Sequence, residues 1–215
     1  MSGPGTPYLI AISGGSCSGK SYVTQRVADT ARHTFNSDIT DSDTDNNISK
    51  LHQDSYYKGG NSETNFDEPG AVDWDLLVHH ITELKNGNSI EVPLYSFETH
   101  SRLNKTEKIY PSKVIIIEGT MILSNKCITE LCNLKIFVSA YPELMYARRL
   151  KRDVEERGRD IEEVNERYFR DVIPGTIMYT DTGKQYADII LLNNSHHKFV
   201  GLEILLDHIE KKLKQ

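Results

Sequence analysis

The chain has 215 residues, with 25 Lys and Arg against 31 Asp and Glu, and a net charge of −6. This acidic balance argues against a general affinity for nucleic acids or anionic membranes, because both favour a basic surface. No apolar stretch approaches the roughly 18 residues that cross a bilayer, so we expect a single domain over residues 1–215 of a soluble, cytoplasmic protein.

Short apolar runs alternate with amphipathic stretches along the chain. The pattern predicts strands near 8–13, 48–52, 113–117, 134–138 and 187–192. It predicts helices near 20–33 and 73–86 and another that begins near Pro142. The last three strands read as continuous apolar runs, which is typical of strands buried on both faces. Strands separated by helices indicate an α/β fold with a doubly wound, mainly parallel sheet.

The segment at 36–47, NSDITDSDTDNN, is acidic and poor in apolar residues. Such a segment buries too little surface to order itself, so we interpret it as a mobile surface loop of low complexity.

The most informative stretch is Gly14–Ser21, GGSCSGKS, which matches the phosphate-binding pattern G-x-x-x-x-G-K-[ST]. It follows a predicted strand and precedes a predicted helix, as this motif requires. Backbone N–H groups of the loop can surround phosphate oxygens, Lys20 can reach the terminal phosphates, and the Ser21 hydroxyl can bind magnesium. The alternative is a small-residue turn that only caps the helix. We expect a bound nucleoside triphosphate.

Two fragments that could suggest a GTPase fail on inspection. Asp67-Glu68-Pro69-Gly70 has the form D-x-x-G but follows no buried strand, and Asn125-Lys126 lacks the Asp that would complete N-K-x-D.

Two carboxylates follow predicted strands. Glu118 ends the run VIIIEG, at the edge of the sheet where ligands bind, and can hold magnesium beside the phosphate loop. Asp54 lies just past the second strand and can accept a proton from a substrate hydroxyl. The plain alternatives are a helix-capping Glu and a turn-capping Asp.

Arginines gather between Tyr141 and Asp160. Arg149 and Arg152 lie on one face of the predicted helix, and Arg157-Gly158-Arg159 then leaves it. One interpretation is a small lid, over about 148–160, that closes on a triphosphate. The other is a solvated helix whose arginines pair with neighbouring acids.

Taken together, these segments resemble the uridine kinase family of P-loop kinases. The resemblance rests on segments that occur in family order: GGSCSGKS, QDSYYK, NFDEPGAVDWDLL, PLYSFETHSR, VIIIEG, RRLKRDVEERGRD and KQYADIIL. It implies ATP-dependent phosphorylation of the ribose 5′-hydroxyl of uridine or cytidine, as in pyrimidine salvage. It also implies a nucleoside-binding insertion, a small-molecule substrate and a homotetramer or homodimer.

The resemblance also assigns roles to residues. Asp54 matches the general base, Lys20 and Arg152 complete the expected catalytic set, and Ser21, Asp54 and Glu118 match the magnesium partners. The expected ATP contacts are Gly14, Gly15, Ser16, Cys17, Ser18, Gly19, Lys20, Ser21, Arg157 and Arg159. For the nucleoside, Asp67 and Arg149 match the groups on the ribose hydroxyls, and Tyr95 and His100 match the readers of the base edge. The expected aromatic walls are Tyr57, Phe66 and Phe97.

The chain departs from the family pattern at the substrate rim. It carries Glu68, Arg167 and Ile173 where the family usually has His, Gln and a basic residue, and Leu192-Asn193-Asn194 replaces Pro-Arg-Gly. Two alternatives therefore stay open: a related P-loop kinase of another small alcohol, such as a phosphoribulose or pantothenate kinase, and a catalytically weak nucleotide-binding regulator.

Overall fold

The computed structural model describes residues 6–36, 47–61, 63–194 and 199–215. The acidic segment that we expected to form a mobile loop lies, apart from its two end residues, outside these ranges. The strands are β1 (Tyr8–Ser13), β2 (Ile48–His52), β3 (Ile90–Ser96), β4 (Ser101–Ile109), β5 (Val114–Gly119), β6 (Leu134–Ser139) and β7 (Ile189–Leu192). The helices are α1 (Lys20–Asn36), α2 (Trp74–Lys85), α3 (Lys126–Leu131), α4 (Pro142–Glu155), α5 (Ile161–Arg167), α6 (Ile173–Gly175) and α7 (Val200–Leu213).

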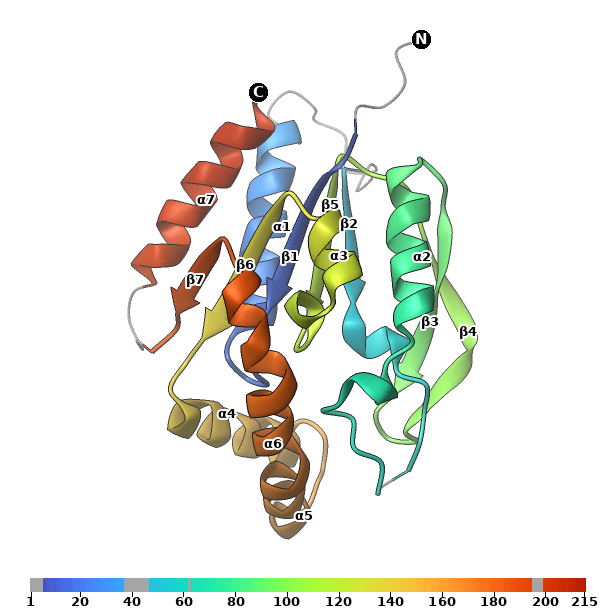
Figure 1. Ribbon diagram of the computed structural model, residues 1–215, viewed down its shortest axis with the longest axis vertical. Coiled ribbons are helices and arrows are strands. Elements are labelled where there is room, and N and C mark those ends of the chain that lie inside the picture. The colour runs from blue at the N-terminus through green and yellow to red at the C-terminus, as the bar shows by residue number, and fades with distance from the viewer. Residues whose placement is uncertain (1–5, 37–46, 62, 195–198) are drawn as a thin grey trace.

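The main sheet confirms the predicted α/β architecture. Within the described residues its strands run parallel in the order β2-β5-β1-β6-β7 (Figure 1). The order changes direction at β1, because the chain passes from β1 to one side of the sheet and later to the other. Open parallel sheets bind ligands at the carboxyl edge beside such a switch point.

Alternate residues of β1 point into two separate cores. Ile10 and Ile12 pack against α1 and α7 on one face of the sheet, whereas Leu9 and Ala11 belong to a second cluster that includes residues of α2 and α3. Every residue of β5 is buried, as its unbroken apolar run predicted. Helices on both faces explain why this central strand needs apolar side chains on both sides.

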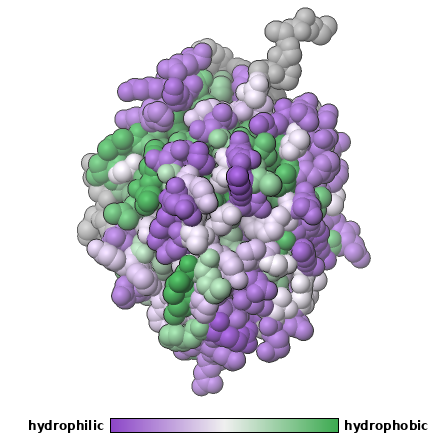
Figure 2. All heavy atoms as spheres, in the orientation of Figure 1, coloured by the Kyte–Doolittle hydropathy of each residue, from purple (hydrophilic) through white to green (hydrophobic). Residues whose placement is uncertain are grey.

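The prediction that the last strand is also buried on both faces was wrong. Leu191 is buried, but Ile190 and Leu192 are 49% and 65% exposed. β7 lies at the edge of the sheet, and one of its faces lacks a covering helix among the described elements. Figure 2 shows hydrophobic surface at this side of the molecule, over β7 and α7.

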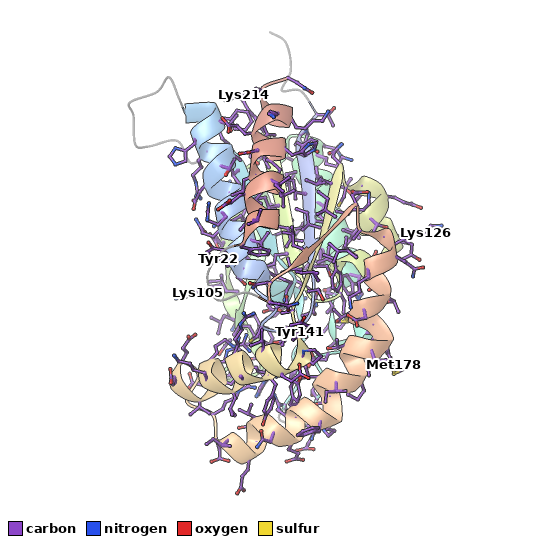
Figure 3. The ribbon with its side chains drawn as sticks, turned by 90° about the vertical axis from the view of Figure 1, so that its left-hand side faces the viewer. Tyr22, Lys105, Lys126, Tyr141, Met178 and Lys214 are labelled. Atoms are coloured by element: carbon purple, nitrogen blue, oxygen red, sulfur yellow. The ribbon has the colours of Figure 1, made fainter. Side chains whose placement is uncertain are left out.

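Two further parts lie outside the main sheet. β3 and β4 pair antiparallel to form a hairpin, which packs beside α2 and contacts the turn after β2. α4, α5 and α6 lie beyond the carboxyl edge of the sheet, where Figure 3 places Tyr141 at the start of α4. Among the described residues, no helix is both long enough and apolar enough to cross a membrane.

Candidate active site

The phosphate loop fills the gap between β1 and α1, and glycine is required at both of its ends. Gly14 has φ +146°, and a Cβ there would lie 2.1 Å from the carbonyl oxygen of Val138. Gly19 has φ +102°, and a Cβ there would lie 2.2 Å from the Asn193 side-chain nitrogen. The loop therefore passes close to other parts of the chain and delivers its backbone N–H groups to the start of α1, where the helix dipole favours an anion.

The side chains at the start of α1 meet the end of β5. Lys20 is buried and its Nζ donates to the carbonyl oxygen of Gly15 at 2.9 Å. Burial lowers the pKa of Lys20, and the nearby Glu118 and Asp54 oppose this shift. The Ser21 hydroxyl donates to Glu118 Oε1 at 2.7 Å. This arrangement places the amino group of Lys20 beside the loop, close to the oxygen atoms of Ser21 and Glu118.

Glu118 has the geometry of a metal-binding carboxylate. It is 8% exposed, and its Oε2 atom accepts no hydrogen bond from the described residues. The ring atom Nδ1 of His52 lies 3.6 Å from Oε2. A buried carboxylate oxygen without a donor, next to a serine hydroxyl, fits Mg²⁺, which takes one or two protein oxygens together with phosphates and waters.

Asp54 lies in a short 3-10 turn, Gln53–Tyr56, directly after β2. The turn is fixed by Gln53, which is fully buried and accepts a hydrogen bond from the N–H of Met121 at 2.9 Å. A Cβ at Gly119 would lie 2.4 Å from the Gln53 side chain, so only glycine leaves room for it. The carboxyl ends of β2 and β5 are adjacent, which brings Asp54 to the same edge as Glu118.

The predicted aromatic residues form one cluster. The ring of Tyr57 lies 5.2 Å from Phe66 and 5.4 Å from Tyr95, and Phe97 lies 5.4 Å from Tyr95. His100 stacks on Phe66 at 5.5 Å with an interplanar angle of 15°. The cluster joins the turn after β2 to the β3–β4 hairpin. Flat apolar rings with polar tips suit the face and edge of a nucleobase.

Two polar groups of this cluster, the Tyr95 hydroxyl and the His100 ring, can bind a ligand. The Tyr95 hydroxyl is buried and has no hydrogen-bond partner among the described residues. Burial, followed by the charges of Arg167 and Arg159, lowers the pKa of His100 below its usual 6.5. His100 is therefore a neutral donor and acceptor at pH 7.

Asp67 and Arg149 lie in the same cavity as the aromatic cluster. Burial raises the pKa of Asp67, Arg149 opposes the shift, and Asp171 adds to it. The helical stretch that carries Asp171 passes very close, because a Cβ at Gly175 would lie 2.2 Å from the Asp67 carbonyl oxygen. Arg149 donates to the Ser16 hydroxyl at 3.0 Å, so it touches the phosphate loop as well.

The arginines near the end of α4 converge on Asp153. Arg152 lies 2.8 Å from Asp153 Oδ1 and Arg157 lies 3.3 Å from it, while Arg149 and Arg159 lie 3.4 and 3.9 Å from Oδ2. The Asp153 side chain is fully buried. The helix ends before Gly158, as predicted, and the arginines line the cavity while staying partly exposed.

The solvated-helix interpretation holds only for the outer side of α4. There, Lys151 and Glu155 form an exposed pair at 3.9 Å. Arg148 turns toward the end of β7 and donates to the carbonyl oxygen of Asn193 at 3.3 Å.

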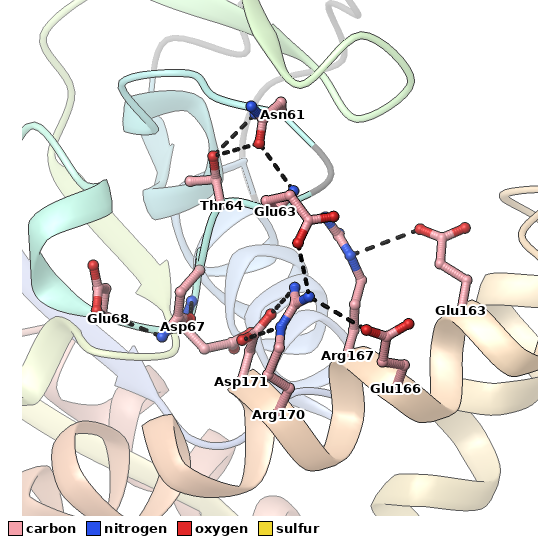
Figure 4. A network of polar contacts seen from close by, with 11 residues as sticks. Asn61, Glu63, Thr64, Asp67, Glu68, Glu163, Glu166, Arg167, Arg170 and Asp171 are labelled. Carbon is pink, nitrogen blue, oxygen red and sulfur yellow. Dashed lines mark hydrogen bonds and ion pairs between the residues drawn. The ribbon is translucent and has the colours of Figure 1, made fainter.

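A polar network attaches the segment 63–68 to the helical stretch 163–171 (Figure 4). Arg170 contacts Asp171 at 2.9 Å, Glu63 at 3.4 Å and Glu166 at 3.6 Å. The segment carries Asp67, so the network helps to fix the position of this predicted ribose-binding group.

Most of the predicted residues line one cavity of about 510 Å³. The predicted residues in its wall are Ser16, Cys17, Gly19, Lys20, Ser21, Asp54, Tyr57, Phe66, Asp67, Tyr95, Phe97, His100, Glu118, Arg149, Arg152, Arg157 and Arg159. Gly14, Gly15 and Ser18 belong to the phosphate loop but lie outside this wall. Of the three unusual rim residues, Arg167 reaches the cavity, whereas Glu68 and Ile173 do not.

Sequence reasoning missed three residues that shape the site. Asp153 was considered only as a partner in a solvated helix, although it is the buried centre of the arginine cluster. Asp171 lines the cavity, and no motif pointed to it. Asn193 donates to the carbonyl oxygen of Ser18 at 2.8 Å and so supports the phosphate loop, a role that its place in the unusual Leu192-Asn193-Asn194 segment did not reveal.

Comparison with known sequences gives consistent matches over nearly the whole chain. Residues 9–199 match the model of a family described as "Phosphoribulokinase / Uridine kinase family". A uridine kinase of Clostridium tetani is 36% identical over 216 residues, covering 97% of both chains. A uridine kinase of Mannheimia succiniciproducens is 38% identical over 190 residues, covering 85% of this chain and 84% of the relative.

The fold is also similar to that of solved structures. A solved structure from Bacillus stearothermophilus, titled "a Possible Uridine Kinase", superimposes with a TM-score of 0.60 and 16% identity, covering 86% of this chain and 88% of the other. At that identity the likeness concerns the fold alone.

Proposed function

The chain belongs to the phosphoribulokinase / uridine kinase family, and from this premise we propose that it transfers the γ-phosphoryl group of ATP to the ribose 5′-hydroxyl of uridine or cytidine. The products are the nucleoside monophosphate and ADP. The bond formed joins phosphorus to the 5′-oxygen, the bond broken is the one to the β-phosphate oxygen, and the hydroxyl proton leaves to a base.

One observation carries the proposal. A phosphate loop and an aromatic cluster with polar tips line the same cavity of about 510 Å³. Phosphate loops serve many acceptors, so the loop alone does not choose among them. The cluster of Tyr57, Phe66, Tyr95 and Phe97 with His100 supplies ring faces and edge hydrogen bonds, which suit a pyrimidine. A sugar phosphate or a pantothenate-like acceptor has no ring for it to stack on.

The residues divide the work of phosphoryl transfer. Asp54 orients the 5′-hydroxyl and accepts its proton, a role for which positioning matters more than basicity. Lys20 and the loop N–H groups neutralise the donor phosphates, and Arg152, Arg157 and Arg159 neutralise the charge on the transferring group. Asp67 accepts hydrogen bonds from the ribose hydroxyls and Arg149 donates to them, which holds the sugar by complementary geometry.

Ser21 and Glu118 would hold Mg²⁺, with Asp54 at the same edge of the sheet. When bound, the ion would supply positive charge that neutralises the donor phosphate oxygens during phosphoryl transfer.

The proposal is tested by measuring ADP release from ATP and magnesium with uridine, cytidine, adenosine, pantothenate and ribulose 5-phosphate, each offered separately. The Lys20→Ala variant is the control. We expect turnover with uridine or cytidine that the control lacks. Turnover only with pantothenate or ribulose 5-phosphate would replace the nucleoside by another alcohol, and ATP binding without turnover of any acceptor would favour a regulator.

A further inference from the structure

Asp153 has surroundings that helix packing alone does not require. It is a fully buried carboxylate near the end of an amphipathic helix, and it is surrounded by arginine side chains that also line the active-site cavity. Burying a carboxylate is costly unless charged partners surround it. Several guanidinium groups held close together also repel one another unless an anion lies between them.

The two oxygens of Asp153 hold different partners. Oδ1 binds Arg152 and Arg157 at 2.8 and 3.3 Å. Oδ2 lies 3.4 Å from Arg149 and 3.9 Å from Arg159, and it accepts no hydrogen bond from the described residues. Arg152 is therefore hydrogen-bonded to Oδ1, whereas Arg149, Arg157 and Arg159 are held by the charge of the carboxylate at longer distances.

The attached arginines reach both ends of the cavity. Arg149 contacts the phosphate loop through Ser16 and shares the cavity with Asp67. The guanidinium of Arg157 lies 4.6 Å from the centre of the Phe97 ring, and Phe97 touches Tyr95. The connection also runs through the backbone, since the N–H of Arg159 donates to the carbonyl oxygen of Asp153 at 3.0 Å.

We propose that Asp153 is a positioning residue that holds the arginines of both subsites in one arrangement and so couples nucleoside binding to triphosphate binding. The inference rests on the proposed function. When one ligand draws an arginine toward it, the shared carboxylate shifts the others, so each ligand prepares the site for its partner. Coupling of this kind is reciprocal: each ligand changes the affinity for the other by the same factor.

The test compares Asp153→Asn and Asp153→Glu with the wild type and with Glu155→Gln. The last is a matched control, because Glu155 lies on the same helix but is exposed and, within the described part of the chain, pairs with Lys151. The affinity for uridine is measured with and without ADP, and the affinity for ADP with and without uridine, beside kcat. We expect Asp153→Asn to lose the mutual dependence and to lower kcat by roughly 10- to 100-fold, as misplacement of about 1 Å does. Asp153→Glu should recover part of both, and Glu155→Gln should match the wild type.

A folded Asp153→Asn variant with wild-type coupling and kcat would overturn the inference. If this variant does not fold, the wild type decides: affinities for uridine and ADP that do not depend on each other there would equally overturn the inference.

A substrate-free measurement separates this inference from the proposed function. Limited digestion with trypsin, read by mass spectrometry, reports cleavage after Arg157 and Arg159. We expect faster cleavage in Asp153→Asn than in Glu155→Gln, and equal rates would contradict the positioning role. A wild type that turns over neither uridine nor cytidine would overturn the proposed function, while the trypsin comparison would still decide whether Asp153 holds the arginines.

Discussion

The two ends of the cavity are built in different ways. The phosphate end consists mainly of backbone, held by glycines between β1 and α1 and by the Asn193 contact to Ser18. The end that we propose binds the nucleoside, called the nucleoside end below, consists of side chains from the turn after β2, the hairpin β3–β4 and the segment from α4 to α5. A site built from backbone recognises what all its ligands share, the phosphates. A site built from side chains can change its preference through single substitutions.

Asp54→Asn should give the largest effect, because we propose that Asp54 accepts the proton of the substrate hydroxyl. Asparagine keeps the shape but accepts no proton, so we expect kcat to fall by roughly 10²- to 10⁴-fold, a typical general-base contribution. ADP affinity, measured by calorimetry, should change little. Unchanged kcat would remove Asp54 from this role and leave it as a residue of the turn.

Gly14→Ala should damage the phosphate end and spare the nucleoside end. The new Cβ would meet the Val138 carbonyl oxygen, and φ +146° is strained for alanine. Strain of about 1–3 kcal/mol corresponds to a loss of ATP affinity of roughly 5- to 150-fold, if the loop moves to relieve it. The measurement is nucleotide affinity beside uridine affinity.

Gly87→Ala is the matched control for this change. Gly87 also has a positive φ, +83°, but a Cβ there would meet no atom within 4 Å. It should lower the melting temperature slightly and leave nucleotide affinity unchanged. Equal losses of affinity in both variants would mean that crowding at the Val138 carbonyl has no role.

The same contrast between backbone and side chains explains what the sequence could and could not predict. The phosphate loop is contiguous, and buried strands such as β5 have unbroken apolar runs, so both were recognised. The aromatic cluster joins segments far apart in the chain, and only a family resemblance brought Tyr57 and His100 together.

Some elements had misleading or weak local signals. The hairpin was missed because β4 is exposed along most of its length and lacks an alternating apolar pattern. The helical stretch after α5 continues through Pro174 and Gly175 by means of π-helical turns, whereas these residue types usually end a helix. Gly175 is required there because the Asp67 backbone lies against it. Asp153 resembles any other acid of a charged helix until the surrounding arginines are placed in space.

His100→Ala should affect the nucleoside end alone. Loss of about one neutral hydrogen bond, near 1 kcal/mol, would raise the KM for uridine about 5-fold and leave the KM for ATP unchanged. His79→Ala, at an exposed position of α2, is the control. The base-reading role predicts that binding of ribose, which lacks the base, is unaffected; an equal loss for ribose and uridine would contradict it.

The smallest expected effect is a difference in how the two ends respond to pH. Protonation of His100, whose pKa is lowered below 6.5 by burial, and of Asp67, whose pKa is raised above 3.8 by burial, removes the forms that bind the nucleoside. Acidification from pH 7 toward pH 5 should therefore raise the KM for uridine by a few-fold, as expected for part of one hydrogen bond. Lys20 changes its charge on the alkaline side of pH 7, and burial lowers its pKa below 10.5. Its charge disappears as the pH rises, so the KM for ATP should increase on the alkaline side. In His100→Ala the rise in the KM for uridine at acidic pH should shrink, while the rise in the KM for ATP at alkaline pH persists. If the variant changed both pH dependences equally, the two ends would not titrate independently.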